Sequence, residues 1–293
     1  MKPVVATIIY DRDAGERARI LEGLREWRAL GLEVIASAGR SGKELKNQAK
    51  DMGVTLIERD GLLYGNGMRQ AIQAAGEKTD VVIWTEGDKS GKFGFQSHVS
   101  RCLAFFDRTK ADITVIGRTK ESMLTHPHQQ KFSEEGIINF FYFKALEDIA
   151  GGQKYNITDF CYGPKIIGKR ALKHFVESEH LNYAACFTPL LAAAKKGLNM
   201  NEIKVPMEFV LKNEFGDANA LAFRAWQAYE IIEPIIAHYM EANPRRLLNF
   251  VLPELTKRME MFKELAVGAA EDPARPIETA YARHFRISHD VLK

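Results

Sequence analysis

The stretch DVVIWTEGDKSGKF, residues 80–93, is an apolar run that ends on two carboxylates one residue apart. Residues 81–84 have the pattern of a buried strand in a parallel sheet. Glu86 and Asp88 follow at its carboxyl end, where open α/β sheets bind their ligands. Carboxylates at this spacing, with a glycine between them, can hold one hard divalent cation that takes further ligands from water and phosphate. A solvated acidic turn is the alternative interpretation.

Strand and helix patterns alternate on both sides of this stretch through the first half of the chain. Strands are predicted at residues 4–10, 33–36, 54–57, 81–85 and 113–116, and helices at residues 14–30, 42–52, 65–75 and 96–108. Alternation at this period predicts an α/β fold, with a mostly parallel sheet, right-handed crossovers and helices on both faces.

The second half of the chain is more irregular. The pattern predicts, in order, a polar loop at 118–135, an amphipathic helix at 137–151, a loop at 155–167 that leads into a strand, a helix at 185–196, an edge strand at 202–210, and helices at 220–240 and 244–265 with an interruption near Pro234. We therefore expect a first domain over residues 1–218 and a helical extension over residues 219–293. The extension could pack on the first domain or form a surface for homo-oligomers.

The composition indicates a soluble globular protein of 293 residues, with 46% hydrophobic and 27% charged residues. The net charge is +3 and the basic residues are scattered, so we expect no nucleic-acid partner. Apolar runs stay short of the ~20 residues that span a membrane. The three cysteines are widely spaced and fit neither a disulfide framework nor a zinc site. A cytoplasmic location is expected.

A second motif, LLYGNGMRQAI at residues 62–72, lies just before the acidic strand. Gly65 and Gly67 permit close backbone approach and a helix start, and a helix N-terminus favours phosphate. Arg69 would lie in the first turn and could reach an anionic group. An ordinary connection between a loop and a helix is the alternative.

A third motif, NITDFCYGPKIIGKRAL at residues 156–172, carries Asp159 before a turn that contains Gly163 and Pro164. A carboxylate on such a turn could position an acceptor hydroxyl or act as a general base. It could equally form the turn by bonding to its own backbone.

In this order, the motifs resemble those of the GT-A glycosyltransferases. The likeness is to glycosyltransferase family 2, on the side of the dolichol- or polyprenyl-phosphate mannosyltransferases. The family's Asp-x-Asp triplet corresponds to residues 86–88, and its Asp-Pro-x-x-Gly-Phe-Arg segment is matched loosely by Asp159, Gly163 and Lys165. Its Glu-Val-Pro-Ile strand is matched by residues 204–207.

The resemblance implies a GT-A three-layer sandwich with a mostly parallel central sheet. It implies a glycosyltransferase that moves a sugar from a nucleotide-diphosphate sugar to a small-molecule or lipid-linked acceptor. Glu86 and Asp88 would hold Mg²⁺ or Mn²⁺ against the diphosphate. Arg69, Lys89 or Arg118 would assist through charge-assisted hydrogen bonds, and Asp159 would orient or deprotonate the acceptor.

Three departures from the family are visible in the sequence. The first acidic position is Glu86 instead of aspartate, and Lys89 directly follows the triplet. The family's Asp-Asp-Gly-Ser stretch corresponds to residues 36–41, which contain no carboxylate. Asp11 could serve the nucleotide instead, although an acidic pair that starts a helix is the commoner explanation.

Two other functions are compatible with this pattern. A sugar-phosphate nucleotidyltransferase would need a Gly-rich basic loop after the first strand, and residues 10–15 suit it poorly. A non-catalytic GT-A-like binding module would explain the altered triplet. His126 and His128 are candidates near the acceptor. The aromatic run at residues 140–143 is interpreted as core, with peripheral membrane contact as the alternative.

Overall fold

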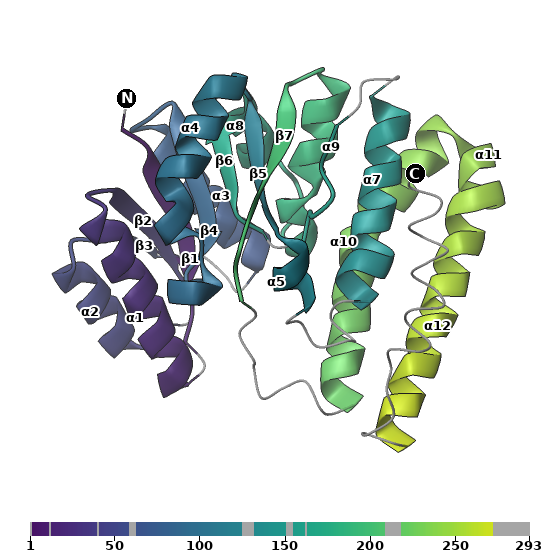
Figure 1. Cartoon of the computed structure of the whole chain (residues 1–293), viewed down its shortest axis with the longest axis horizontal. Coiled ribbons are helices and arrows are strands. Elements are labelled where there is room, and N and C mark those ends of the chain that lie inside the picture. Colours follow the sequence, from purple (N-terminus) through teal and green to yellow (C-terminus); the bar gives the residue numbers. More distant parts are fainter. Residues whose placement is uncertain are drawn as a thin grey trace.

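The computed structural model describes residues 2–11, 13–39, 41–58, 63–124, 132–150, 155–161, 163–208 and 218–271. Its centre is a seven-stranded sheet in the order β3-β2-β1-β4-β6-β5-β7 (Figure 1). The strands are β1 (Val4–Ile9), β2 (Glu33–Ala38), β3 (Thr55–Glu58), β4 (Val81–Glu86), β5 (Ile113–Arg118), β6 (Lys165–Gly168) and β7 (Met200–Val205). Strand β6 is antiparallel to β4 and β5, and the other neighbours are parallel.

Helices cover both faces of the sheet, as the alternation predicts. On one face lie α1 (Ala14–Ala29), α2 (Lys43–Asp51) and α4 (Val99–Thr109), and on the other lie α3 (Tyr64–Gly76), α7 (Phe140–Ile149), α8 (Lys169–Val176) and α9 (Thr188–Lys195). Successive strand residues alternate between the two layers of core: Ala6, Val82 and Trp84 face one, and Val5 and Ile83 the other. Both faces are buried, which explains the continuous apolar strands.

The remaining described elements are shorter helices and the C-terminal helices. They are α5 (Lys120–Leu124), the 3₁₀ turns η1 (Gly91–Phe93), η2 (Gln96–His98) and η4 (Tyr183–Cys186), the π-helical segments η3 (Phe132–Asn139) and η5 (Leu247–Val251), and helices α10 (Ala218–Ala242), α11 (Pro244–Arg246) and α12 (Leu252–Glu271). Among the described residues, no helix has the length and apolarity needed to cross a membrane.

Three local predictions differ from the structure. The stretch expected to be a polar loop contains helix α5. The edge strand β7 spans Met200–Val205 instead of residues 202–210, because its pairing with β5 starts at Ile113 and ends at Arg118. Helix α10 runs through Pro234 without interruption. Ile231 and Ile235 flank that proline in the core, so tertiary packing overrides the local cost of a proline.

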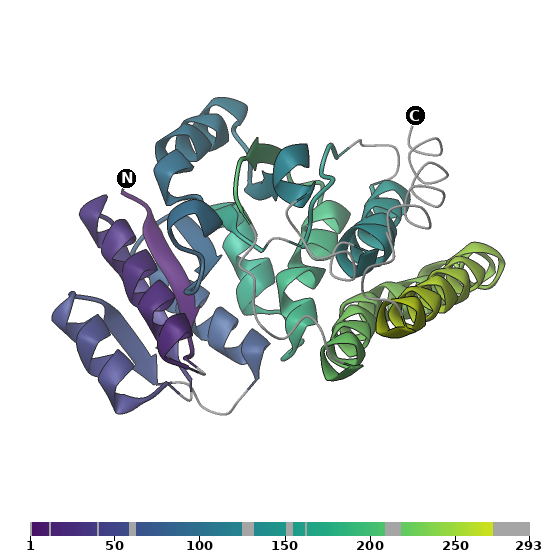
Figure 2. The ribbon, with the colours of Figure 1, turned by 60° about the horizontal axis from the view of Figure 1, so that its bottom comes forward.

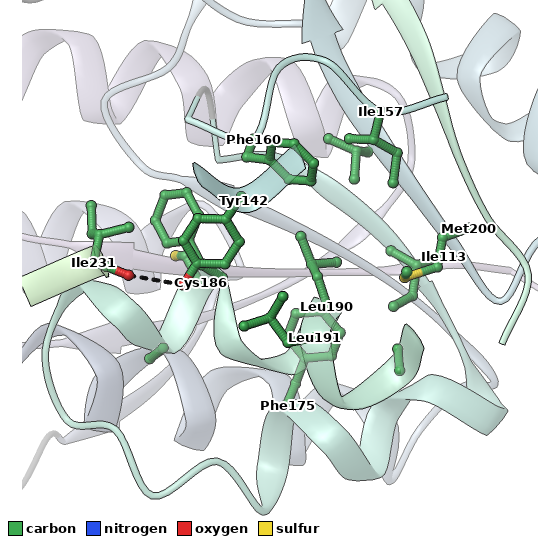
Figure 3. Close-up of a cluster of buried hydrophobic side chains, with 14 of the residues drawn as sticks. Ile113, Tyr142, Ile157, Phe160, Phe175, Cys186, Leu190, Leu191, Met200 and Ile231 are labelled. Atoms are coloured by element: carbon green, nitrogen blue, oxygen red, sulfur yellow. Dashed lines mark hydrogen bonds between the residues drawn. The ribbon is translucent and has the colours of Figure 1, made fainter. Parts of the chain in front are cut away.

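The C-terminal helices share one hydrophobic core with the sheet layer. Ile231 and Ile235 of α10 belong to the same buried cluster as Tyr142 of α7 and Phe187. The Tyr142 hydroxyl donates to the Ile231 carbonyl across 2.9 Å (Figure 3). Figure 2 shows α10 and α12 at the opposite end of the molecule from α1 and α2. The C-terminal helices therefore pack on the sheet layer, which is the first of the two arrangements expected from the sequence. Formation of homo-oligomers stays a prediction.

The aromatic run of α7 lies in the core, as interpreted from the sequence. Phe140, Phe141 and Tyr142 are all buried, and Phe143 packs half-buried against the same cluster. The guanidinium of Arg258, on α12, lies 3.8 Å from the centre of the Phe140 ring. Peripheral membrane contact through this run stays a prediction.

Helix α3 begins in tight contact with the segment that leads into η4. The Gly65 N–H donates to the Leu181 carbonyl across 2.8 Å. A Cβ added at Gly65 would lie 2.6 Å from the His180 carbonyl oxygen and 2.7 Å from the Ala185 Cβ. Glycine is therefore required at this position because two backbone segments approach each other closely.

We expect Gly65→Ala to lower the free energy of unfolding by about 1–3 kcal/mol, as overpacking does. The clash is with the backbone at His180 and Leu181 and with the Cβ of Ala185, none of which can move away as the end of a long side chain can. Gly76→Ala, at the last residue of the same helix, is the matched control, because its Cβ would meet only the end of the Leu172 side chain, at 3.2 Å. Urea titration of both variants tests this, and equal losses would contradict it.

Candidate active site

Charged residues at or just beyond the ends of four strands lie along one edge of the sheet. Glu86 ends β4 and is followed by Asp88, Arg118 ends β5, and Asp11 follows β1. Lys165 starts the antiparallel strand β6, so its Cα pairs with Trp84 of β4 and Val115 of β5 at the same edge. This is the edge where open α/β sheets bind ligands.

Gly87 fixes the turn that carries the two carboxylates. Its N–H donates to the Ile8 carbonyl of β1 across 3.1 Å, and the Lys89 N–H donates to the Glu86 carbonyl across 3.3 Å. A Cβ at Gly87 would lie 2.7 Å from the Ile8 oxygen. The glycine thus lets β4 remain in contact with β1 while the chain turns.

Helix α1 holds the other side of this turn. The Ser90 hydroxyl donates to Glu22 across 3.1 Å, and the Gly91 N–H donates to both carboxylate oxygens of Glu26 at 3.0 Å. The Gln96 amide donates to the Lys89 carbonyl across 2.6 Å. The acidic turn is therefore fixed from both sides before any ligand binds.

The two carboxylates have different surroundings. Glu86 Oε1 accepts a hydrogen bond of 3.0 Å from the Tyr64 hydroxyl, and Oε2 lies 3.5 Å from the Lys89 ammonium. The Glu86 side chain is 32% exposed, whereas Asp88 is only 9% exposed. The alternative of a solvated acidic turn therefore does not describe Asp88. Lys89 pairs with Glu86 in this structure.

Cation binding by Glu86 and Asp88 stays a prediction. Within the described ranges, no group of three or more His, Cys, Asp or Glu side chains could hold a metal ion. Two carboxylates on a rigid turn fit a hard cation that completes its coordination with phosphate oxygens and water.

Asp159 forms a buried ion pair with Arg118. The Arg118 Nε and Nη2 donate to its two oxygens across 2.6 and 2.7 Å, and the Arg118 backbone N–H adds a third bond of 3.0 Å. Asp159 is 1% exposed and Arg118 2%. Burial raises the pKa of Asp159, but the charge and hydrogen bonds of Arg118 outweigh it, so the pKa lies below its ordinary value.

Glu202, on β7, holds the loop that carries Asp159. Its oxygens accept from the Asp159 N–H across 2.8 Å and from the Thr158 hydroxyl across 2.9 Å. Burial and the nearby Asp159 charge raise the pKa of Glu202. The carboxylate lies where a Cβ on Gly117 of β5 would be. The sequence analysis missed this role, because an acidic residue in the partly polar edge strand MNEIKV gives no local signal of it.

Lys165 is fully buried at the centre of this edge. Among the described residues, its ammonium donates to one acceptor, the Gly163 carbonyl, across 2.7 Å, and lies 5.8 Å from the centre of the Phe187 ring. Burial lowers the pKa of Lys165, although nearby thiol and carboxyl groups, including Glu86 and Asp159, oppose the shift. Since an ammonium has three donors, one described acceptor leaves capacity for a ligand oxygen.

Asp11 and Asp13 have separate structural roles. Asp11 accepts from Arg17 Nε across 2.8 Å and from the Gly42 N–H across 3.2 Å, so it joins the end of β1 to helices α1 and α2. Asp13 caps α1 by accepting from the Glu16 N–H. The interpretation that an acidic residue in this pair starts a helix therefore holds for Asp13. Nucleotide binding by Asp11 stays a prediction.

The glycine motif before the acidic strand is used largely for internal contacts. The Gly65 N–H, expected to face phosphate, donates to Leu181, and Arg69, expected to reach an anion, donates to the Ser178 carbonyl and to Asn66, both across 3.0 Å. Gly67 is buried within α3, and its N–H donates to the Leu63 carbonyl. The structure gives these residues internal contacts, and their predicted phosphate contacts stay a prediction. His126 and His128 lie outside the described residues.

Comparison with known proteins places the fold. No family model and no curated protein matches the sequence. The structure is similar to glucosyl-3-phosphoglycerate synthase from Mycobacterium tuberculosis in complex with Mn²⁺, UDP and glucosyl-3-phosphoglycerate, at 11% identity and TM-score 0.54 over 79% of each chain. The same enzyme with Mn²⁺, UDP-glucose and phosphoglyceric acid gives 10% identity and TM-score 0.53 over 79% of each chain.

A further mycobacterial protein is similar at 11% identity and TM-score 0.55, over 79% of this chain and 73% of the other. At such identities the likeness shows the fold alone. The predicted GT-A fold, with its mostly parallel mixed sheet, is confirmed.

We expect Asp159→Asn to lower the free energy of unfolding by about 3–5 kcal/mol, because it leaves the buried Arg118 without its counter-ion. Asp107→Asn removes the exposed pair with Lys110 and should cost about 0–1 kcal/mol. Urea unfolding at neutral pH measures both.

The Asp159 contribution also has a defined pH dependence. Because the pKa of Asp159 is lowered in the folded protein, its stabilisation is present above the pKa of the unfolded chain and is lost as the pH falls through the folded value. The difference between the wild-type protein and Asp159→Asn should therefore shrink in acid. A difference that is small at neutral pH would show that the ion pair contributes little.

Proposed function

We propose that this chain is a glycosyltransferase that moves a sugar from a nucleotide-diphosphate sugar to a small-molecule or lipid-linked acceptor with the help of a divalent cation. The observation that carries the proposal is the pair Glu86 and Asp88, held on a rigid turn at the ligand-binding edge of a GT-A sheet. The two carboxylates would bind the cation, Mg²⁺ or Mn²⁺, beside the donor diphosphate.

When bound, such a cation acts as a Lewis acid that neutralises charge on the departing nucleotide diphosphate. The chain contributes a preorganised place for it. Gly87 fixes the turn to β1, while Glu22 and Glu26 fix it to α1. Side chains that are held before the substrate arrives need no reordering in the transition state.

Two ammonium groups next to this turn support an anionic substrate. Lys89 lies 3.5 Å from Glu86 and would become available to the diphosphate once a cation replaces it there. Lys165 is buried with one described acceptor and has donors for a further oxygen of the donor or the acceptor. Charge-assisted hydrogen bonds of this kind are strong in a site shielded from water.

Asp159 is better suited to positioning than to proton abstraction. Its two oxygens accept from Arg118, and its lowered pKa makes it a weak base. We therefore propose that Asp159 holds Arg118 at the end of β5 and that the ion pair shapes the acceptor side of the site.

The similar enzyme provides the first substrates to test. Glucosyl-3-phosphoglycerate synthase has been crystallised with Mn²⁺, UDP-glucose and phosphoglyceric acid. UDP-glucose is thus the first donor and phosphoglyceric acid the first acceptor, with GDP-mannose and a polyprenyl phosphate as the alternatives that follow from the resemblance to the mannosyltransferases. Residues 1–218 would form the catalytic domain and the C-terminal helices would support it.

One observation favours a second candidate, a binding module without catalysis. The Lys89 ammonium already lies beside Glu86 and could occupy the place of the cation. Such a module would bind a nucleotide sugar without needing metal and would show no turnover.

The test is a thermal-shift screen of UDP- and GDP-sugars with and without Mn²⁺. We expect one nucleotide sugar to raise the melting temperature only with Mn²⁺, since a ligand at 100 times its Kd stabilises by about 2.7 kcal/mol. Glu86→Gln and Asp88→Asn should abolish the turnover and strongly reduce that rise. Asp80→Asn, at the opposite end of β4, is the matched control and should retain both.

Metal-independent binding without turnover would favour the binding module. No response to any nucleotide sugar would contradict both candidates.

A further inference from the structure

Tyr64 connects the start of helix α3 to the proposed cation ligand Glu86. Its hydroxyl donates to Glu86 Oε1 across 3.0 Å and lies 3.2 Å from the Cys186 sulfur. The other carboxylate oxygen, Oε2, lies 3.5 Å from the Lys89 ammonium. One oxygen therefore faces a neutral donor of the protein, and the other faces a cation.

The tyrosine itself is held firmly. Its ring centre lies 4.9 Å from that of Tyr183, and it meets Trp84 edge-on at 6.4 Å. The next residue, Gly65, is clamped to the segment before η4 by its bond to Leu181. Cys186, which touches the Tyr64 hydroxyl, closes the same η4 turn.

The Tyr64 hydroxyl remains a donor at neutral pH. A tyrosine hydroxyl ordinarily loses its proton only near a pKa of about 10, so it is neutral at neutral pH. A neutral hydroxyl whose proton points at a carboxylate orients that carboxylate without cancelling its charge. This differs from an ion pair, which would compete with a metal ion for the same group.

We propose that Tyr64 is a positioning residue: it holds Oε1 of Glu86 and thereby presents Oε2 to the divalent cation. The inference rests on the proposed function, because the cation is the group that Glu86 would bind. Partners that orient metal-binding side chains from outside the coordination sphere typically contribute 10–100-fold to metal affinity. In this structure Oε2 faces the Lys89 ammonium, so a divalent cation bound to Oε2 would lie on that same side of the Glu86 carboxylate.

Tyr64→Phe removes the hydroxyl and keeps the ring. With UDP or GDP present, we expect the concentration of Mn²⁺ that half-saturates the protein to rise about tenfold or more. It is measured from the EPR signal of free Mn²⁺. Turnover at saturating Mn²⁺ should be largely retained, because the carboxylate itself is still present.

Tyr239→Phe is the matched control. Its hydroxyl donates to Asp148 across 2.5 Å, between α10 and α7, so the variant loses the same kind of hydroxyl–carboxylate bond outside the site. Mn²⁺ affinity should be unchanged in this variant. Equal Mn²⁺ affinity in Tyr64→Phe, Tyr239→Phe and the wild-type protein would overturn the positioning role and leave the proposed function intact.

A double-mutant cycle separates positioning from a general effect on the fold. If Tyr64 acts through Glu86, Tyr64→Phe should not weaken the residual Mn²⁺ binding of Glu86→Gln any further. If Tyr64→Phe lowered the Mn²⁺ affinity equally in the wild-type protein and in Glu86→Gln, Tyr64 would not be acting through Glu86. Absence of Mn²⁺ binding to the wild-type protein with either nucleotide would instead show that the proposed function fails, and the inference with it.

Discussion

Strand β6 runs against the direction of its two neighbours, and the candidate site depends on this reversal. A parallel sheet collects only the carboxyl ends of its strands at one edge, whereas an antiparallel strand brings its amino end there. Lys165 consequently lies between the ends of β4 and β5. The loop before β6 brings Asp159 to Arg118 in the same way. With β6 parallel, Lys165 would lie at the opposite edge, away from the acidic turn.

The two buried basic residues at this edge, Arg118 and Lys165, differ in the partners of their charges. Arg118 and Asp159 neutralise each other in a buried pair, and desolvation makes such pairs sensitive to the loss of either member. Lys165 is equally buried, but its described hydrogen bond goes to a neutral carbonyl. The Glu86 and Asp159 carboxylates are near enough to favour its charged form. Under the proposed function, the ammonium donors that Lys165 has beyond this described bond would meet an anionic group of the substrate.

Much of the fold followed from the sequence because apolar runs and helical spacing are local properties. The acidic turn was identified because it directly follows the apolar run 81–84. Contacts between distant segments could not be predicted in the same way. The sequence does not show that Gly65 meets residues 180–185, or that Asp159 meets Arg118, because each contact depends on how remote strands are ordered. Tyr64 was missed because its partner lies 22 residues away, on another element.

The carboxylate of Glu202 lies in the space where a side chain at position 117 would begin, and Gly117 leaves that space free. The same carboxylate secures the backbone at Thr158 and Asp159. A larger residue at position 117 would displace it and release that loop. During divergence these two positions should accordingly change in concert, a compensating pair that links β5 and β7 in the evolutionary record of the chain.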